Sequence, residues 1–292
     1  MFSSTKPNIL ASNQSFQRMA DAASEFKKFF DLYIRVLLLN CGLIRGQASP
    51  CNFVILGRSR TGSNFLRGLL NSHRNILALG EIFRGRNDVC WDIPCYPKTA
   101  SMISLIESDP VAFLQRYVFG KWPDKISAVG FKMFYFYAQD EDRLLVWDYL
   151  EGQKDLKIIH LTRTNMLRTL LSVRRANLNQ KWVNTSGTTE PMQPVRLDYD
   201  ECIGFFRKTR EWELEYDRRF KDHPKVDLTY EELSSDRANN LKRLQEFLDV
   251  EIHHLLPSTY KQTTIPLLDA ICNYSELKER FENSEWIDFF EE

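Results

Sequence analysis

Short apolar segments alternate with longer amphipathic ones along most of the chain. Apolar residues at helical spacing predict helices over residues 63–72, 101–118, 141–150, 165–178 and 200–221 and near 236–248. Four short apolar runs between them indicate buried strands, at Phe53–Gly57, Ala128–Phe134, Lys157–Thr162 and Lys225–Tyr230. Buried strands that alternate with helices are typical of a parallel sheet covered on both faces. The pattern therefore predicts an α/β fold with three layers, in which helices flank a central parallel sheet.

The remaining segments predict a helix at each end and one long loop. Apolar positions at helical spacing over residues 16–39 predict an amphipathic helix ahead of the first strand. A last amphipathic helix is predicted to carry Leu277, Phe281, Trp286, Phe289 and Phe290. Residues 179–198 are rich in Asn, Thr, Gly and Pro and predict a loop of the length that lids and substrate loops have. Without a repeat or a linker, we expect residues 1–292 to form a single domain on which residues 1–45 pack as a helical extension.

Composition narrows the setting of the protein. With 39 basic and 39 acidic side chains the net charge is zero, which gives no reason to expect nucleic-acid binding. The six cysteines are scattered and predict free thiols in a reducing compartment. The N-terminus lacks the pattern of a signal peptide, and the apolar run Val36–Ile44 is shorter than the roughly 20 residues that a bilayer requires. We expect a cytoplasmic protein without a membrane span, and the sequence does not settle its oligomeric state.

The loop after the first strand has the composition of an anion-binding loop. Residues 57–64 read GRSRTGSN and lead directly into a predicted helix. A strand, a glycine-containing loop and a helix N-terminus turn successive backbone N–H groups toward one point, which favours a phosphate or sulfate. Arginine and hydroxyl side chains of the loop add donors to this site. The expected ligand-binding residues are Arg58, Ser59, Arg60, Thr61, Gly62, Ser63 and Asn64.

This loop differs from that of nucleotide triphosphatases. Gly57 and Gly62 fit the pattern G-x-x-x-x-G-K-[ST], but Ser63 and Asn64 replace its lysine and its magnesium-binding hydroxyl residue. A tight turn with a helix cap would account for the glycines and for Ser63, but not for two arginines among the hydroxyl residues. The loop therefore predicts a P-loop-like anion site with another chemistry.

A second polar group follows the strand Lys157–Thr162. Arg163 comes directly after this strand, and the next helix places Asn165, Arg168, Ser172 and Arg175 at positions i, i+3, i+7 and i+10 of one face. Alone, this face fits a solvated basic helix surface equally well. Together with the first loop, it predicts a second anion site.

Both segments resemble the sulfotransferases that use 3′-phosphoadenosine 5′-phosphosulfate. In that family the basic residue precedes the small-Gly-Ser/Thr run, as Arg60 precedes Thr61-Gly62-Ser63 here, and a second site of Arg and Ser holds the 3′-phosphate. Arg163 to Ser172 spans nine positions where the family usually has eight, so either Arg163 or Arg168 supplies the charge. The resemblance runs from Phe53 onward and is nearest to bacterial enzymes that act on carbohydrates and small molecules.

The resemblance implies the chemistry of the site. Its co-substrate would be 3′-phosphoadenosine 5′-phosphosulfate, the product adenosine 3′,5′-bisphosphate, and no metal would be needed. Glu81 would be the general base, whereas His73 and His160 are weaker candidates for it. Lys132, near the end of an apolar strand, either reaches the ligand edge of the sheet or extends to solvent. In relatives a C-terminal basic segment closes over the nucleotide, which here points to Lys261.

Two alternatives stay open at this point: a P-loop kinase-like phosphotransferase, and a non-catalytic nucleotide-binding module with the same fold. The resemblance implies an acceptor hydroxyl on a carbohydrate or another small molecule. Loops 84–98 and 179–198 carry Trp91, Tyr96 and Trp182, which suit sugars or flat molecules, and acidic residues such as Asp88 and Asp92 would suit a cationic natural product such as a guanidinium alkaloid toxin.

Overall fold

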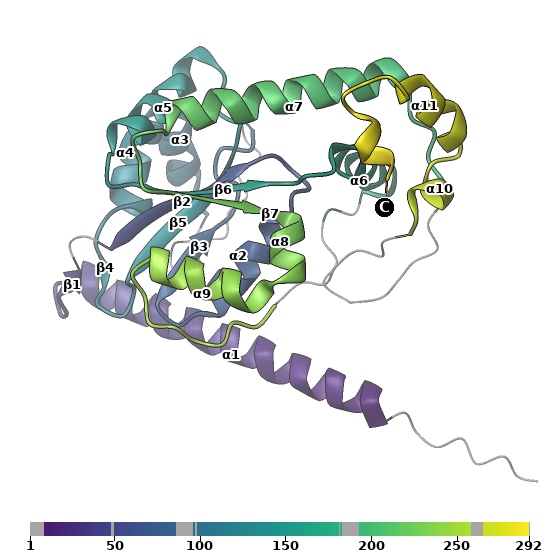
Figure 1. Ribbon diagram of the computed structural model, residues 1–292. Coiled ribbons are helices and arrows are strands. Elements are labelled where there is room, and N and C mark those ends of the chain that lie inside the picture. The colour runs from purple at the N-terminus through teal and green to yellow at the C-terminus, as the bar shows by residue number, and fades with distance from the viewer. Residues whose placement is uncertain are drawn as a thin grey trace, which may run out of the picture.

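A computed structural model gives the arrangement of the chain. It describes residues 9–47, 50–85, 96, 98–180, 182, 193–257 and 265–291. Five strands form one sheet in the order β3 (Ile76–Leu79), β5 (Ala128–Phe134), β2 (Cys51–Gly57), β6 (Lys157–Thr162) and β7 (Lys225–Thr229). Every neighbouring pair in this sheet is parallel. The predicted α/β fold with a central parallel sheet and flanking helices is confirmed (Figure 1).

The strands are buried on both faces because their successive side chains enter different cores. In β2, Phe53 and Ile55 join one apolar cluster, whereas Val54 and Leu56 join the other. The four predicted strands match the observed ones to within two residues. The edge strand β3 was not among them, because its four residues are too short a run to stand out from the preceding helix.

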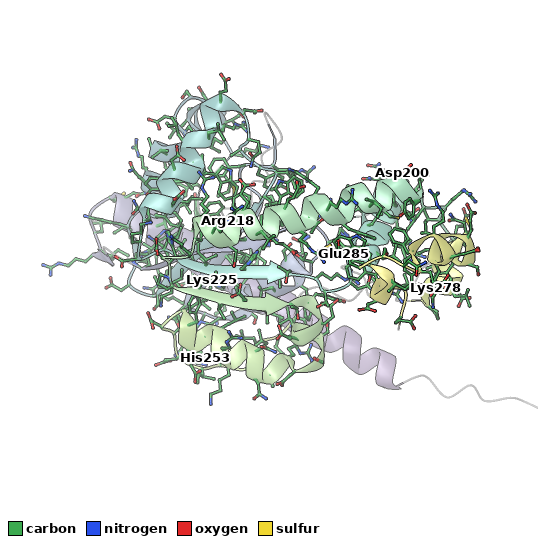
Figure 2. The ribbon with its side chains drawn as sticks, turned by 45° about the horizontal axis from the view of Figure 1, so that its top comes forward. Asp200, Arg218, Lys225, His253, Lys278 and Glu285 are labelled. Atoms are coloured by element: carbon green, nitrogen blue, oxygen red, sulfur yellow. The ribbon has the colours of Figure 1, made fainter. Side chains whose placement is uncertain are left out.

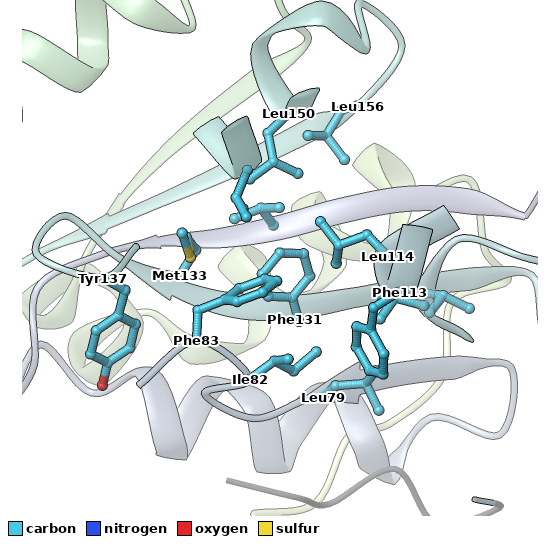
Figure 3. Packing of buried hydrophobic residues seen from close by; sticks show 14 of the residues in the cluster. Leu79, Ile82, Phe83, Phe113, Leu114, Phe131, Met133, Tyr137, Leu150 and Leu156 are labelled. Atoms are coloured by element: carbon cyan, nitrogen blue, oxygen red, sulfur yellow. The ribbon is translucent and has the colours of Figure 1, made fainter. Parts of the chain in front are cut away.

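Helices on each face complete the two cores. One face is covered by α2 (Ser63–Ser72), α8 (Tyr230–Ser235) and α9 (Arg237–Phe247). The other is covered by α3 (Ala100–Ser108), α4 (Pro110–Phe113), the π-helix Leu114–Val118, α5 (Glu141–Gly152) and the second half of α7 (Tyr199–Arg219). Figure 3 shows this second core, where Phe83 from beyond β3 packs against Phe131 of β5 with ring centroids 5.9 Å apart.

The predicted single helix over residues 101–118 is wrong in one respect, because it is interrupted after Ser108. Asp109 accepts a hydrogen bond from the Ala112 amide at 2.9 Å, and Pro110 occupies the first turn of α4. Proline lacks an N–H and disfavours helical backbone in the preceding residue, so one helix ends and another begins here.

Helix α7 contributes to two apolar clusters, one at each of its ends. Its first turn carries Asp200 and Glu201, its last turn Arg218 and Arg219, and both pairs complement the helix dipole. Figure 2 shows Asp200 and Arg218 toward opposite ends of this helix. The first half of α7 packs in a third apolar cluster with α6 (Met166–Asn179), α10 (Leu267–Ala270), α11 (Tyr274–Phe281) and the 3₁₀-helix Ile287–Phe290. The predicted single last helix is therefore wrong in one respect, because α11 ends at Phe281 and a separate 3₁₀-helix carries Phe289 and Phe290.

The N-terminal helix α1 (Ile9–Asn40) is longer than the predicted helix over residues 16–39. It precedes a small ribbon, in which β1 (Gly46–Gln47) pairs antiparallel with β4 (Trp122–Pro123). The Lys28 ammonium donates to the carbonyl oxygens of Asn71, His73 and Ile76 at 2.6–2.9 Å, which fixes α1 to the end of α2. Among the described helices, none combines the length and the apolar character needed to cross a membrane.

Candidate active site

The loop between β2 and α2 has a backbone that few sequences allow. Arg60 and Gly62 adopt left-handed backbone conformations, with φ of 70° and 85°. A Cβ atom on Gly62 would lie 2.6 Å from the Tyr230 ring, so this glycine also permits close packing. The cap of α2 is Gly62, which has no side chain to bond the first amides of the helix. The first turn of α2 thus keeps its N–H groups for a ligand, as an anion site requires.

The arginine of this loop contacts the second polar group. Arg60 Nε donates to Ser172 Oγ on α6 at 2.8 Å, and its Nη1 donates to the carbonyl oxygen of Trp182. Burial lowers the pKa of Arg60, and the positive charge of Arg163 lowers it further. Two partly buried guanidinium groups that destabilise each other's charged form would both gain from a bound anion.

Arg163 lies against the same loop. Its guanidinium stacks 4.7 Å from the centre of the Tyr230 ring, and its Nη1 donates to the Arg60 carbonyl oxygen at 3.4 Å. Burial lowers the pKa of Arg163, against the opposing charges of Tyr230 and Glu231. The structure therefore brings Arg60, Arg163 and Ser172 together, although the two segments are separated by about a hundred residues of chain.

Arg168, the alternative to Arg163, points elsewhere. Its Nη1 donates to the carbonyl oxygen of Ile265 at 2.6 Å, beside the segment that leads to α10. Its backbone N–H donates to Asn165 Oδ1 at 2.9 Å, which caps α6. The hydrogen bond of Arg163 to the Arg60 carbonyl oxygen places this arginine against the β2–α2 loop.

A second group of polar side chains lies at the carboxyl ends of β5 and β3. Lys132 Nζ donates to Asn64 Oδ1 on α2 and to Glu81 Oε1, each at 2.6 Å. Tyr137 donates its hydroxyl hydrogen to Glu81 Oε2 at 2.5 Å. The Lys132 side chain is 1% exposed, so it does not extend to solvent but ends on these two partners. The lysine thus bridges the candidate base and the start of α2.

Glu81 is held in its ionised form. Burial opposes its charge, but the adjacent Lys132 ammonium and the hydrogen bonds from Lys132 and Tyr137 outweigh burial, and the pKa of Glu81 lies below its ordinary value. Its side chain is 17% exposed, so solvent or a small molecule reaches it. An ionised, partly accessible carboxylate is able to accept a proton from a hydroxyl group, and the cation beside it keeps it ionised while lowering its basicity.

Other predicted residues of the loop have local roles. Arg58 Nη1 donates to Thr209 Oγ1 at 2.6 Å, and its guanidinium lies 3.5 Å from the centre of the Phe205 ring. Burial lowers the pKa of Arg58 to about 10. These contacts tie the loop to α7. Thr61 donates its hydroxyl hydrogen to the Arg58 carbonyl oxygen at 2.8 Å and stabilises the turn.

Ser59 is partly exposed in the loop, and Ser63 is buried as the first residue of α2. Lys261 lies outside the described residues, as do Trp91, Asp88 and Asp92.

The two histidines are placed away from Glu81. His73 follows α2, and its Nε2 lies 2.9 Å from the Glu251 carbonyl oxygen. His160 is buried in β6, where its Nε2 lies 2.6 Å from the Tyr135 hydroxyl. His160, Asp217 and Asp227 bring ligand atoms within 4.8 Å of one another, and the Lys225 ammonium contacts both carboxylates and offsets part of their charge.

Sequence reasoning missed the contacts of Tyr137 and Tyr230. Tyr137 follows β5 in the aromatic run after the strand, so its place at the ligand edge of the sheet was the available signal. Tyr230 is the first residue of α8, whose capping box is formed by Thr229 and Glu232, and the Tyr230 ring covers Gly62 and Arg163. Only the packing of β7 beside β6 reveals that contact.

Known proteins resemble this chain over most of its length. No family model matches the chain. Nodulation protein H from Rhizobium tropici is 28% identical over 251 residues, which cover 85% of this chain and 96% of that protein. Nodulation protein H from Rhizobium meliloti strain 1021 is 28% identical over 249 residues, with 83% and 96% covered. The crystal structure of a sulfotransferase from Alicyclobacillus acidocaldarius aligns with a TM-score of 0.46 and 16% identity over 83% of this chain and 95% of that one.

Proposed function

Because the chain belongs to the sulfotransferase family, as a distant homologue of nodulation protein H, we propose that it transfers a sulfuryl group from 3′-phosphoadenosine 5′-phosphosulfate to a hydroxyl of a small molecule or carbohydrate. The observation that carries the mechanism is the position of Lys132. Its ammonium contacts Glu81 on one side and Asn64, at the start of the anion-binding helix, on the other. An acceptor hydroxyl held at Glu81 therefore lies next to a donor bound at α2.

The donor would occupy two anion sites. The 5′-phosphosulfate binds at the N–H groups of the first turn of α2, with Arg60 as a charged donor. The 3′-phosphate binds at Arg163 and Ser172, which contact the backbone and the side chain of Arg60 respectively. Arg58 and Thr61 stabilise the loop rather than bind the nucleotide directly. The resemblance adds Lys261 as a nucleotide-binding residue.

The transfer would proceed in line. The acceptor oxygen attacks the sulfur, the bond from sulfur to the bridging phosphate oxygen breaks, and its electron pair leaves with adenosine 3′,5′-bisphosphate. Glu81 accepts the acceptor's hydroxyl proton, while Lys132 and Arg60 stabilise the negative charge on the sulfuryl oxygens and the departing phosphate. Positioning and positive charge supply most of the rate enhancement in such a reaction, and no residue here requires a metal for its role.

The aromatic residues after β5 would guide the acceptor. Phe136 is 38% exposed, and its ring centroid lies 5.0 Å from that of Tyr137, whose hydroxyl contacts Glu81. A sugar or another uncharged ring stacked on Phe136 would place a hydroxyl group toward the base. The positive charges of Lys132 and Arg84, which lower the pKa of Glu81, disfavour a cationic acceptor at this point. A carbohydrate or neutral small-molecule acceptor therefore suits the described residues best.

The test is Glu81→Gln, compared with the wild type and with Glu107→Gln. Glu107 pairs with buried Arg143 at 2.6 Å and resembles Glu81 in burial and pairing, but it lies on α3 outside the site. We expect Glu81→Gln to lose about 10²–10⁴-fold in turnover while adenosine 3′,5′-bisphosphate still binds, and Glu107→Gln to keep wild-type turnover. Mass spectrometry of donor-loaded enzyme with panels of sugars, lipids and alkaloids finds the acceptor by its gain of sulfate mass. Equal turnover in wild type and Glu81→Gln would refute the role of this carboxylate.

The two alternatives make different predictions in the same assay. A kinase-like phosphotransferase would bind ATP with magnesium and would not release adenosine 3′,5′-bisphosphate. A non-catalytic binding module would bind the nucleotide without turnover in any variant.

A further inference from the structure

The described side chains of helix α1 contact the body of the protein along one side. Leu32 and Val36 are buried in the core, and Lys28 holds the end of α2. The side facing away exposes five large apolar side chains, and the exposed fractions of Phe26 and Phe30 reach 71% and 58%. The five are Phe26, Phe30, Tyr33, Ile34 and Leu37. Such a contiguous apolar surface on one helix indicates an interaction site.

The spacing of this surface is that of a coiled coil. Phe26, Phe30, Tyr33 and Leu37 follow one another at intervals of four, three and four residues, which is the a/d spacing of a heptad repeat. The same spacing continues toward the N-terminus of the helix at Ala23, Met19 and Phe16. We call these seven positions the α1 seam. Three heptads of apolar a/d positions are the sequence pattern that leads two helices to pack along their length.

We propose that the α1 seam binds the α1 seam of a second copy of this chain, in an antiparallel two-helix pair. Figure 1 shows that the N-terminal part of α1 extends beyond the body, whereas its C-terminal part lies along it. In an antiparallel pair the extending half of each helix covers the exposed half of the other, and the two bodies lie at opposite ends. A parallel pair would instead place both bodies at the same end of the helices.

The sequence fits the antiparallel arrangement residue by residue. A two-fold axis near Lys28 sets Phe26 opposite Phe30 of the second copy, and Ala23 opposite its Tyr33. An aromatic pair thus fills the centre, and a small residue faces a large one on either side of it. This alternation of sizes gives close packing of the facing helices.

Area and charge favour a second copy over a membrane surface. With about 150–250 Å² for a whole aromatic side chain, the exposed fractions leave on the order of 500 Å² of apolar area per copy. Two copies then reach the roughly 1,000 Å² that marks a specific interface. A membrane-bound helix is rich in basic residues, but the charged residues of α1 nearly balance: Arg18, Lys27, Lys28 and Arg35 against Asp21, Glu25 and Asp31.

The oligomeric state of the full-length protein tests the proposal. We expect sedimentation equilibrium to give twice the chain mass of 34.4 kDa at micromolar concentration. The double variant F26E/F30E should sediment as a monomer, with the dimer weakened by about a hundredfold or more, and should keep the wild-type circular dichroism. Leu214→Glu is the control, since Leu214 is 57% exposed on α7 and lies outside the α1 seam. A monomeric wild type, or a dimer that persists in F26E/F30E, would overturn the proposal.

Exposed Cys41, one residue beyond α1, reports the orientation of the pair. At 1.5 Å of rise per residue, the antiparallel arrangement separates the two Cys41 positions by about 40 Å, so mild oxidation leaves them unlinked. Disulfide-linked Cys41 peptides in the dimer would refute the antiparallel arrangement.

Discussion

Replacing Lys132 by methionine removes the cation that bridges Glu81 and Asn64. The ammonium lies 2.6 Å from Glu81 Oε1, and the lysine side chain is 1% exposed, so the pair is almost completely shielded from water on the lysine side. Removing one partner of a buried ion pair typically costs about 3–5 kcal/mol, because the other charge remains buried and unpaired. In Lys132→Met, the Glu81 carboxylate keeps only part of its stabilisation, from the Tyr137 hydroxyl and from the charge of Arg84.

The variant should also reverse the pH dependence that Glu81 contributes. In the wild type the pKa of Glu81 is lowered from its usual 4.5, so its contribution to stability is present above that value and is lost as the pH falls through the lowered pKa. Without Lys132, burial dominates and raises the pKa of this carboxyl group. Ionisation of Glu81 then destabilises the folded protein as the pH rises, so the loss of unfolding free energy in Lys132→Met should be smaller at pH 5 than at pH 7.

Urea unfolding followed by tryptophan fluorescence measures both effects. We expect a loss of about 3–5 kcal/mol at pH 7 and a smaller loss in the double variant K132M/E81Q, which carries no buried charge at this position. Arg143→Met is the matched control, since it breaks another buried pair, with Glu107, but leaves the nucleotide site intact. A loss below about 1 kcal/mol at pH 7, or equal losses in Lys132→Met and K132M/E81Q, would refute this reasoning.

Three further changes test other parts of the site. Gly62→Ala should lower the free energy of unfolding by about 1–3 kcal/mol and weaken nucleotide binding, because φ is 85° and the new Cβ would lie 2.6 Å from the Tyr230 ring. Urea unfolding and calorimetry on one sample measure both effects, and a variant as stable as the wild type would contradict the geometry. Tyr137→Phe removes a hydrogen bond to ionised Glu81, so the pKa of Glu81 should rise and the acid limb of the rate profile should move to higher pH; an unmoved profile counts against that contact. Arg163→Met should weaken adenosine 3′,5′-bisphosphate more than adenosine 5′-phosphate, and equal losses in calorimetry would remove Arg163 from the 3′-phosphate site.

Most of the fold could be predicted from the sequence because most helices and strands have a clear apolar period or a turn residue at their boundary. Strand β5 is a continuous apolar run apart from Lys132. Helix α2 is preceded by Gly62, whose left-handed backbone turns the chain into the helix. Strand β3 was missed because Ile76–Leu79 offers too few residues for a period to appear. The break before Pro110 was missed because the apolar spacing continues through it.

The site followed from sequence only where the chemistry is carried by a local motif. The loop at Arg60 and the helix carrying Ser172 were each recognised separately, but their contact depends on β2 and β6 being neighbours in the sheet. The Lys132–Glu81 pair joins residues 51 positions apart, and sequence spacing gave no reason to connect them. Local motifs therefore identify candidate site residues, whereas the order of the strands in the sheet decides which of these residues contact one another.

The central claim is that the loop at Arg60 and the Arg163–Ser172 group together bind a ribose that carries phosphates at its 3′ and 5′ positions. Isothermal titration calorimetry with adenosine 3′,5′-bisphosphate in the presence of EDTA tests it most directly. The account predicts one tightly bound nucleotide per chain, unaffected by removal of metal and lost in Arg60→Ala. No heat and no thermal shift with this nucleotide, or binding only of ATP and only with magnesium, would contradict it.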